Sequence, residues 1–157
     1  MNPDHLVELA EQILQIGTGY PRQATINRAV STAYYALFHA LSQDCVARTV
    51  RAPRSSLYWP IVTPIYRAIE HASARRVFDR ITKDMAASRA LREVAEAFLE
   101  LQSARITADY DPRPDNRLSR KEAVDLLQQG RAAIDALRSM PKDRRLLLAV
   151  QLISKPR

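Results

Sequence analysis

A row of polar side chains between residues 28 and 42 carries groups that could do acid–base chemistry. Arg28, Ser31, Tyr35, His39 and Ser42 recur at three- and four-residue spacing, which places them along one side of a helix. An unperturbed histidine titrates near about pH 6.5, so His39 is the candidate general base. The row indicates either the wall of a cleft or a partly buried line of hydrogen bonds, in which His39 would have a structural role.

A second group of candidate residues, Arg105, Asp109 and Tyr110, lies close to a proline-rich break. The planar guanidinium of Arg105 can bind a phosphate through two hydrogen bonds. If the two helices pack antiparallel, Arg105 and Tyr110 would line one cleft with the polar row that begins at Arg28. The structural alternative is a local ion pair between Arg105 and Asp109, which are four residues apart, with Tyr110 packing the helix end.

His71 begins a further polar patch together with Glu70, Arg75 and Arg76. The patch could contact a substrate, and its alternative interpretation is a solvated helix face. The sequence offers no metal-ligand spacing, because its three histidines are dispersed and Cys45 is its single cysteine. It also lacks a phosphate-binding glycine loop and a nucleophile elbow. We therefore expect no metal and no cofactor.

The composition favours an all-α fold. Alanine, leucine, arginine and glutamine are abundant helix formers, and the chain has only three glycines. Apolar residues at three- and four-residue spacing predict six helices, with a loop at 51–60. We place these helices at Pro3–Ile16, Pro21–Val50, 61–81, 84–109, Ser119 to Pro141, and 142–153. Long helices with short connections predict an up-and-down bundle of four or five helices.

The 157 residues fit a single helical domain over residues 1–140, followed by a basic C-terminal helix and tail over 141–157. The apolar side chains of this last segment should dock on the bundle or on a second copy. No apolar run reaches the ~20 residues that span a bilayer. The first residues lack the pattern of a signal peptide, and a lone cysteine fits a reducing compartment. We expect a cytoplasmic protein.

The formal net charge is +7. Between Arg138 and Arg157 there are six basic residues and one acidic residue. This charge favours RNA, DNA or an acidic protein as a partner, although a solvated surface is the simpler explanation.

Three segments together resemble the HEPN family of helical proteins. They are RAVSTAYYALFHA at 28–40, RITADYDP at 105–112, and YRAIEH at 66–71 followed by Arg75 and Arg76. The resemblance covers roughly residues 5–138 and implies a HEPN-like helical bundle that often forms homodimers. Many members of the family are metal-independent ribonucleases. Some are toxins paired with a small nucleotidyltransferase antitoxin, and others serve in defence systems.

The resemblance is incomplete at the motif that the active members use, an arginine followed a few residues later by a histidine near the end of a late helix. Arg105 matches the arginine, but Tyr110, Asp111 and Pro112 stand where the histidine would be. Position 106 is isoleucine instead of a polar residue.

The resemblance leads to two hypotheses of different classes. In the first, the chain is a HEPN-type toxin or defence protein acting on RNA, with a nucleotidyltransferase or antitoxin partner. Metal-free RNA cleavage needs a base and a cation that stabilises the transition state, for which the candidates are Arg105 with His39 or Tyr110. The substrate-binding candidates are Arg28, Tyr35, Asp109 and His71. In the second, the same bundle is a non-catalytic interaction module for a protein or a nucleic acid.

Overall fold

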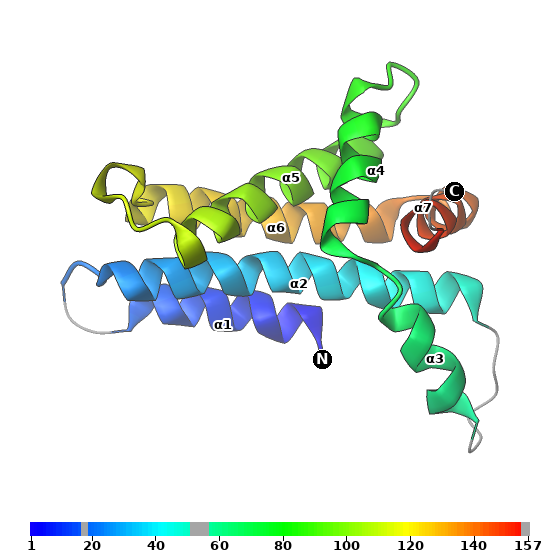
Figure 1. Ribbon diagram of the computed structural model, residues 1–157, viewed down its shortest axis with the longest axis horizontal. Coiled ribbons are helices and arrows are strands. Elements are labelled where there is room, and N and C mark those ends of the chain that lie inside the picture. Colours follow the sequence, from blue (N-terminus) through cyan, green and yellow to red (C-terminus); the bar gives the residue numbers. More distant parts are fainter. Residues whose placement is uncertain (17–18, 51–56, 155–157) are drawn as a thin grey trace.

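The computed structural model describes residues 1–16, 19–50 and 57–154, and all regular structure in these ranges is helical (Figure 1). The predicted all-α fold class is therefore confirmed. The described elements are α1 (Pro3–Gln15), α2 (Gln23–Thr49), α3 (Tyr58–Tyr66), α4 (His71–Lys83), α5 (Arg89–Tyr110), the 3₁₀ turn η1 (Pro114–Asn116), α6 (Arg120–Ser139) and α7 (Lys142–Ile153).

Helices α1, α2, α5 and α6 form a bundle around α2, the longest helix with 27 residues. In Figure 1, α1 and α6 run beside α2, and α5 crosses them obliquely. Helices α5 and α6 also pack against each other, and α1 packs against α6. The start of α1 follows from the sequence, since the Asn2 side chain accepts a hydrogen bond from the Asp4 amide at 3.0 Å and Pro3 occupies the first helical position.

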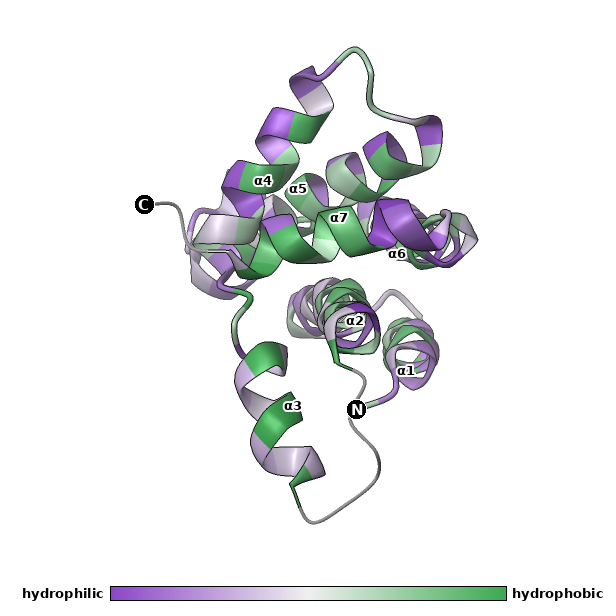
Figure 2. Ribbon diagram, turned by 90° about the vertical axis from the view of Figure 1, so that its right-hand side faces the viewer, coloured by the Kyte–Doolittle hydropathy of each residue, from purple (hydrophilic) through white to green (hydrophobic). Residues whose placement is uncertain are grey.

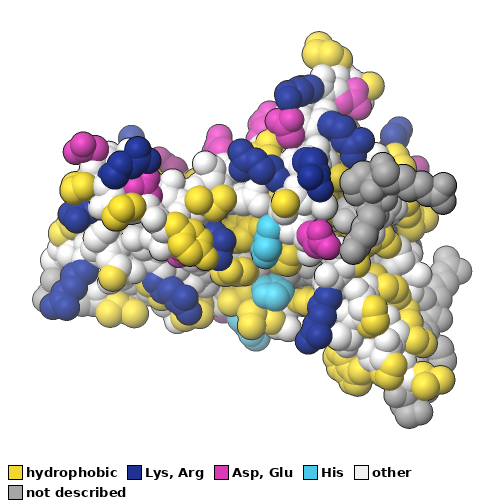
Figure 3. All heavy atoms as spheres, in the orientation of Figure 1, with side chains coloured by type: hydrophobic (Ala, Val, Ile, Leu, Met, Phe, Trp, Pro, Cys, Tyr) yellow, Lys and Arg dark blue, Asp and Glu magenta, His cyan; other side chains and the backbone are white. Residues whose placement is uncertain are grey.

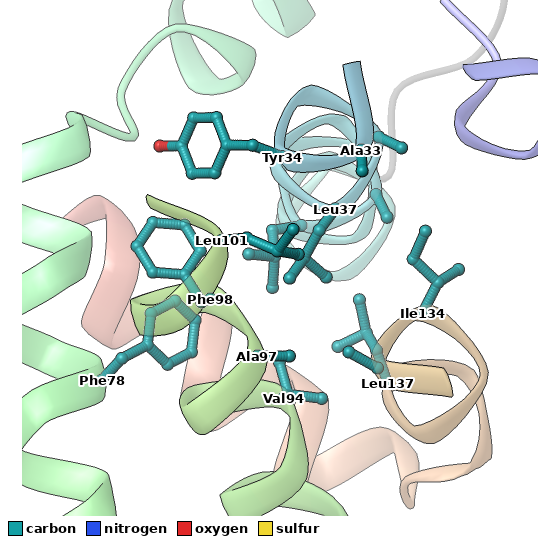
Figure 4. Packing of buried hydrophobic residues seen from close by; sticks show 14 of the residues in the cluster. Ala33, Tyr34, Leu37, Phe78, Val94, Ala97, Phe98, Leu101, Ile134 and Leu137 are labelled. Atoms are coloured by element: carbon teal, nitrogen blue, oxygen red, sulfur yellow. The ribbon is translucent and has the colours of Figure 1, made fainter. Parts of the chain in front are cut away.

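The core lies between α2, α5 and α6 (Figure 4). The apolar stripe predicted for α2 is buried, except that Phe38 stays partly exposed. Phe98 and Leu101 of α5 are fully buried and face α2 in Figure 4. At Gly130 of α6, an added Cβ would lie 3.2 Å from Leu101 Cδ1, so this glycine allows α5 and α6 to approach closely.

The prediction of one continuous helix over 61–81 is wrong. The chain forms α3 and α4 instead, with a break between Tyr66 and His71. Pro64, which we expected only in a first turn, lies inside α3, and Pro60 sits in the stretch predicted as loop yet is helical. The break has a tertiary cause, because α3 packs on α2 whereas α4 packs on α5. The remainder of the predicted loop, 51–56, lies outside the described residues.

Helix α6 begins at Arg120, directly after the predicted start at Ser119, whereas α5 begins at Arg89 and not at the predicted residue 84. Ser88 caps α5 with its hydroxyl accepting from the Leu91 amide at 3.3 Å. Ser119 and Glu122 form a capping box at the start of α6, with both reciprocal hydrogen bonds present. Helix α5 extends to Tyr110, one residue beyond its predicted end, which brings the Tyr110 side chain onto the same helix as Arg105.

Helix α7 docks on the bundle, which is one of the two arrangements predicted for it; the other was docking on a second copy. Arg145 forms an ion pair with the buried Asp44 of α2, and Leu148, Ala149 and Leu152 belong to the same core as the other helices. Of the basic residues predicted to form a tail, Lys155 and Arg157 lie outside the described residues.

Candidate functional site

The candidate site lies where the last two turns of α5 meet the first half of α2. Two polar contacts fix this crossing. Asn27 Nδ2 donates to the Ala108 carbonyl at 2.7 Å, and Ser31 Oγ donates to Asp109 Oδ1 at 2.6 Å. Such contacts align the two helices in register, and they place the polar row of α2 against the Arg105 end of α5.

Arg105 is held by three side chains of this crossing. Its Nη2 donates to Tyr35 Oη at 2.9 Å, and its Nε lies 2.8 Å from Asp109 Oδ2. The Nε–H is not aligned for a hydrogen bond, so the Asp109 contact is an ion pair. The guanidinium carbon also lies 5.6 Å from the centre of the Tyr35 ring and 5.4 Å from that of Tyr110.

These contacts nearly enclose the charged group. The Arg105 side chain is 20% exposed and that of Asp109 is 29% exposed. Burial acts to lower the pKa of Arg105, but Tyr35, Asp109 and Tyr110 together raise it above its usual value. Arg105 therefore stays protonated, and its charge is balanced mainly by its own helix neighbour. Tyr110 is the open edge of this cluster, with 68% of its surface exposed.

His39 lies on the other side of Tyr35, with the two ring centres 6.5 Å apart. Its Nδ1 shares a hydrogen bond of 2.5 Å with the hydroxyl of Tyr66 at the end of α3, and the two rings are stacked. Burial lowers the pKa of His39, and the positive N-terminus adds to this effect. The neutral imidazole is thus favoured, with one ring nitrogen already engaged.

His71, the first residue of α4, has an equivalent arrangement. Its Nδ1 shares a 2.5 Å hydrogen bond with the hydroxyl of Tyr34, and its ring lies 4.3 Å from that of Phe38. Figure 4 shows the Tyr34 ring reaching out of α2 with its hydroxyl directed away from the core. Burial lowers the pKa of His71, followed in importance by the charge of Arg105. His71 is therefore a neighbour of the Arg105 cluster and not part of a separate patch.

A glutamine of α5 connects this region to α4. Gln102 is 6% exposed, and its Nε2 donates to the His71 carbonyl at 2.9 Å. Its Oε1 accepts from Arg75 Nη1 at 3.3 Å. In Figure 3, histidine side chains occupy the middle of this face, with Lys and Arg side chains over α4 and α5.

Arg28 is not brought into the cluster. It occupies an exposed position on α2, its backbone carbonyl accepts from Thr32 Oγ1, and in the described ranges its side chain has no ion-pair partner. The structure thus joins Tyr35, Arg105, Asp109 and Tyr110, and it places His39 and His71 beside them.

Sequence reasoning missed Tyr34, Tyr66 and Gln102 as members of this polar region. Tyr34 was assigned to the apolar stripe of α2, and its ring is indeed buried. The sequence could have indicated a buried hydrogen-bonding role for Gln102, because it is a polar residue one turn after the core residue Phe98. Tyr66 has none, since its contact with His39 depends on the path of α3.

No group of three or more His, Cys, Asp or Glu side chains in the described ranges could hold a metal ion. Burial raises the pKa of the Cys45 thiol to about 12, with Asp44 adding to the effect, which keeps this cysteine protonated and unreactive. Within the same ranges, no helix has both the length and the apolar character needed to cross a membrane.

Comparisons with known proteins find no relative of this chain. No family model matches the chain, and neither the curated proteins nor the solved structures searched contain a match. The HEPN resemblance therefore remains a prediction from the three sequence segments.

Proposed function

We propose that the chain is a HEPN-like interaction module that binds an acidic macromolecule without cleaving it. The observation that carries this proposal is the engagement of Arg105 by Tyr35, Asp109 and Tyr110. A catalytic arginine must offer its donors to charge that develops on the substrate. Here the guanidinium already serves a carboxylate and a hydroxyl of its own chain.

A phosphate that took the place of Asp109 or Tyr35 at Arg105 would break these contacts. Release of Asp109 would leave its carboxylate with Ser31 alone, and release of Tyr35 would leave a partly buried hydroxyl without its donor. Each lost hydrogen bond to a charged group costs about 1.5–3 kcal/mol. The arrangement is better suited to fastening α5 onto α2 than to contacting substrate.

The histidines support the same conclusion. His39 and His71 each have Nδ1 bonded to a tyrosine hydroxyl, and each helps to attach α3 or α4 to α2. A structural role accounts for both contacts, and the histidine of the HEPN motif is absent from its expected position.

The charge of the chain supports an acidic partner. The net charge is +7, and several exposed cations in the described ranges have no acidic partner, Arg28 and Arg80 among them. The HEPN resemblance is consistent with a protein partner such as a nucleotidyltransferase or antitoxin, and with a homodimer. A buried free cysteine fits a cytoplasmic location.

The proposal is tested by expressing wild type and Arg105→Ala in cells while following growth and RNA integrity. We expect equal growth and intact RNA for both, together with lower stability of the Arg105→Ala protein. In parallel, purified wild type is titrated against fluorescent poly(U) and fluorescent polyglutamate. Binding of at least one probe, weakening as salt rises, is expected. Binding to neither probe would contradict the proposal.

The second candidate is the HEPN-type ribonuclease toxin that uses Arg105 with His39 or Tyr110. One observation favours it, because Tyr35 contacts Arg105 on one side and lies against His39 on the other. The same growth experiment distinguishes the two. If wild type slows growth and degrades RNA while Arg105→Ala does neither, the toxin is correct and the non-cleaving module is wrong.

A further inference from the structure

A groove between α4 and α7 lies outside the Arg105 cluster. It has a volume of about 560 Å³ and is lined by Ser73, Arg76, Val77, Arg80, Val150 and Gln151, among others. Figure 2 shows α7 lying across the end of the bundle with α4 rising beside it, and both helices contact each other. The groove is therefore formed by two helices that the rest of the fold holds in place.

Two arginines supply uncompensated positive charge along the α4 side. Arg76 Nη2 donates to Ser73 Oγ at 3.1 Å, which does not offset its charge. In the described ranges Arg80 has no hydrogen-bond or ion-pair partner. Asp79 also lines the groove, and its carboxylate is paired with Lys83 at 2.7 Å. Because Arg76 and Arg80 are four residues apart, they sit one turn, or about 6 Å, along the same helix side.

On the α7 side, the groove is lined by the apolar Val150 and by the polar Gln151 and Ser154. Val150 is 44% exposed, and Leu146 and Leu147 on the preceding turn are 43% and 52% exposed. These three side chains lie on the face of α7 opposite the buried Leu148 and Leu152. An exposed apolar stripe beside charged residues is typical of a surface that binds a partner.

We propose that this groove docks an acidic amphipathic helix of a partner protein. Its apolar side would cover Leu147 and Val150, and its carboxylates would pair with Arg76 and Arg80. This is the helix-in-groove mode of recognition, with charge complementarity that sets the orientation. The inference rests on the proposed function, since it names the partner and the surface of the interaction module.

Two other occupants fit less well. None of the described residues that line the groove is aromatic, so these residues offer the bases of a nucleic acid no ring to stack on. A second copy of the chain carries the same net charge of +7, which disfavours its approach to two free arginines.

The test uses the full chain and a fluorescein-labelled designed helix with leucine at i, i+3, i+4 and i+7 and glutamate at its other exposed positions. Binding is followed by fluorescence anisotropy for wild type and for the double variant Arg76→Glu/Arg80→Glu. A matched control, Arg117→Glu/Lys121→Glu, makes the same charge change at exposed positions near the start of α6. We expect the groove variant to bind about tenfold more weakly or worse, and the control to bind within about twofold of wild type.

A second variant, Val150→Ser, tests the apolar side without any change of charge, and we expect it to weaken binding by about fivefold. Circular dichroism confirms that each variant is folded. Absence of wild-type binding, or equal losses in the groove and control variants, would overturn the proposal. So would single-stranded RNA binding that only the groove variant loses, or self-association that only this variant abolishes.

The two proposals fail in distinguishable ways. RNA cleavage that depends on Arg105 would defeat the non-cleaving module while leaving helix binding in the groove intact. If the designed helix does not bind and the RNA stays uncleaved, only the assignment of the groove is wrong.

Discussion

Helix α3, which together with α4 forms an arm, buries far fewer of its residues than the bundle helices do. In the bundle, α2 buries residues toward α1, α5, α6 and α7, and side chains such as Phe98 are fully enclosed. In the arm, α3 buries only Val62 among its own residues and leaves Trp59 70% exposed. Helix α4 adds Ala74, Val77, Phe78 and Ile81 to the core against α5. The arm also makes two tyrosine–histidine hydrogen bonds with α2, Tyr66 with His39 and Tyr34 with His71.

Apolar burial and polar contacts contribute different amounts to the free energy of unfolding. Burial gives the bundle most of its free energy of unfolding, since each enclosed large side chain contributes about 1.5–3 kcal/mol. A neutral hydrogen bond contributes about 1 kcal/mol net. We therefore expect α3 to be the less stable helix of the arm and the one whose position responds to its surroundings.

The largest expected effect is in the bundle. Phe98→Ala removes a ring that lies 4.6 Å from the ring of Phe78 and 5.7 Å from that of Tyr34. We expect the free energy of unfolding to fall by about 3–5 kcal/mol, because the substitution leaves a cavity in a closely packed core. Urea denaturation followed by circular dichroism measures this change. A loss below about 1 kcal/mol would show that the core is not packed as described.

The next effect compares two carboxylates. Asp44 of α2 is 7% exposed and pairs with Arg145 and Arg48, whereas Asp79 of the arm is 52% exposed in its pair with Lys83. Asp44→Asn should cost about 3 kcal/mol, because it leaves partly buried arginines without their charge partner. Asp79→Asn should cost less than about 1 kcal/mol. Equal costs in urea denaturation would remove the distinction between the two regions.

The arm should be sensitive to mild acid. The pKa values of His39 and His71 are lowered by burial, so below about pH 6.5 the unfolded chain binds more protons than the folded one. Stability is fully present above about pH 6.5 and falls as the pH drops toward the folded-state pKa values. We expect wild type to be less stable at about pH 5.5 than at about pH 7.5, a range in which carboxylates stay ionised.

Histidine variants test whether His39 and His71 cause this pH dependence of stability. His39→Gln/His71→Gln should be less sensitive than wild type over the same range, whereas His5→Gln, at an exposed position of α1, should behave like wild type. An unchanged pH dependence in the double variant would show that His39 and His71 are not its source.

The smallest expected effect is at the tip of the arm. Trp59→Ala should change the free energy of unfolding by no more than about 0.5 kcal/mol, because most of the side chain is exposed and its described ring contact is with the neighbouring Tyr58. Comparison of this small loss with the large loss expected for Phe98→Ala would show most clearly that α3 is less buried than the bundle. A loss of more than about 2 kcal/mol would mean that α3 is part of the core.

The same division explains what the sequence could predict. The bundle helices follow from apolar spacing and local caps, as the Ser119–Glu122 capping box illustrates. The arm did not follow, because 61–81 carries continuous helix-forming residues and its break arises from packing on α2 and α5. Local pattern cannot reveal that two halves of one apolar segment pack on different helices.

The candidate site was predictable in part for a related reason. Spacing placed Tyr35 in a polar row and Arg105 beside Asp109, and both contacts are present. It could not show that Arg28 lies apart from the cluster, because the crossing of α2 and α5 brings only Ser31 and Tyr35 of the row to Arg105 and Asp109. It also gave no means to pair His39 with Tyr66, which comes from the misassigned arm.

Arg105 contacts Asp109 and Tyr35 of its own chain, and our proposal is that it does not act on RNA. The most direct measurement is a time course of a 5′-labelled single-stranded RNA incubated without metal with purified wild type and with Arg105→Ala, resolved on a denaturing gel. We predict no cleavage product from wild type beyond that seen with the variant. Product that forms with wild type and disappears in Arg105→Ala would contradict the account.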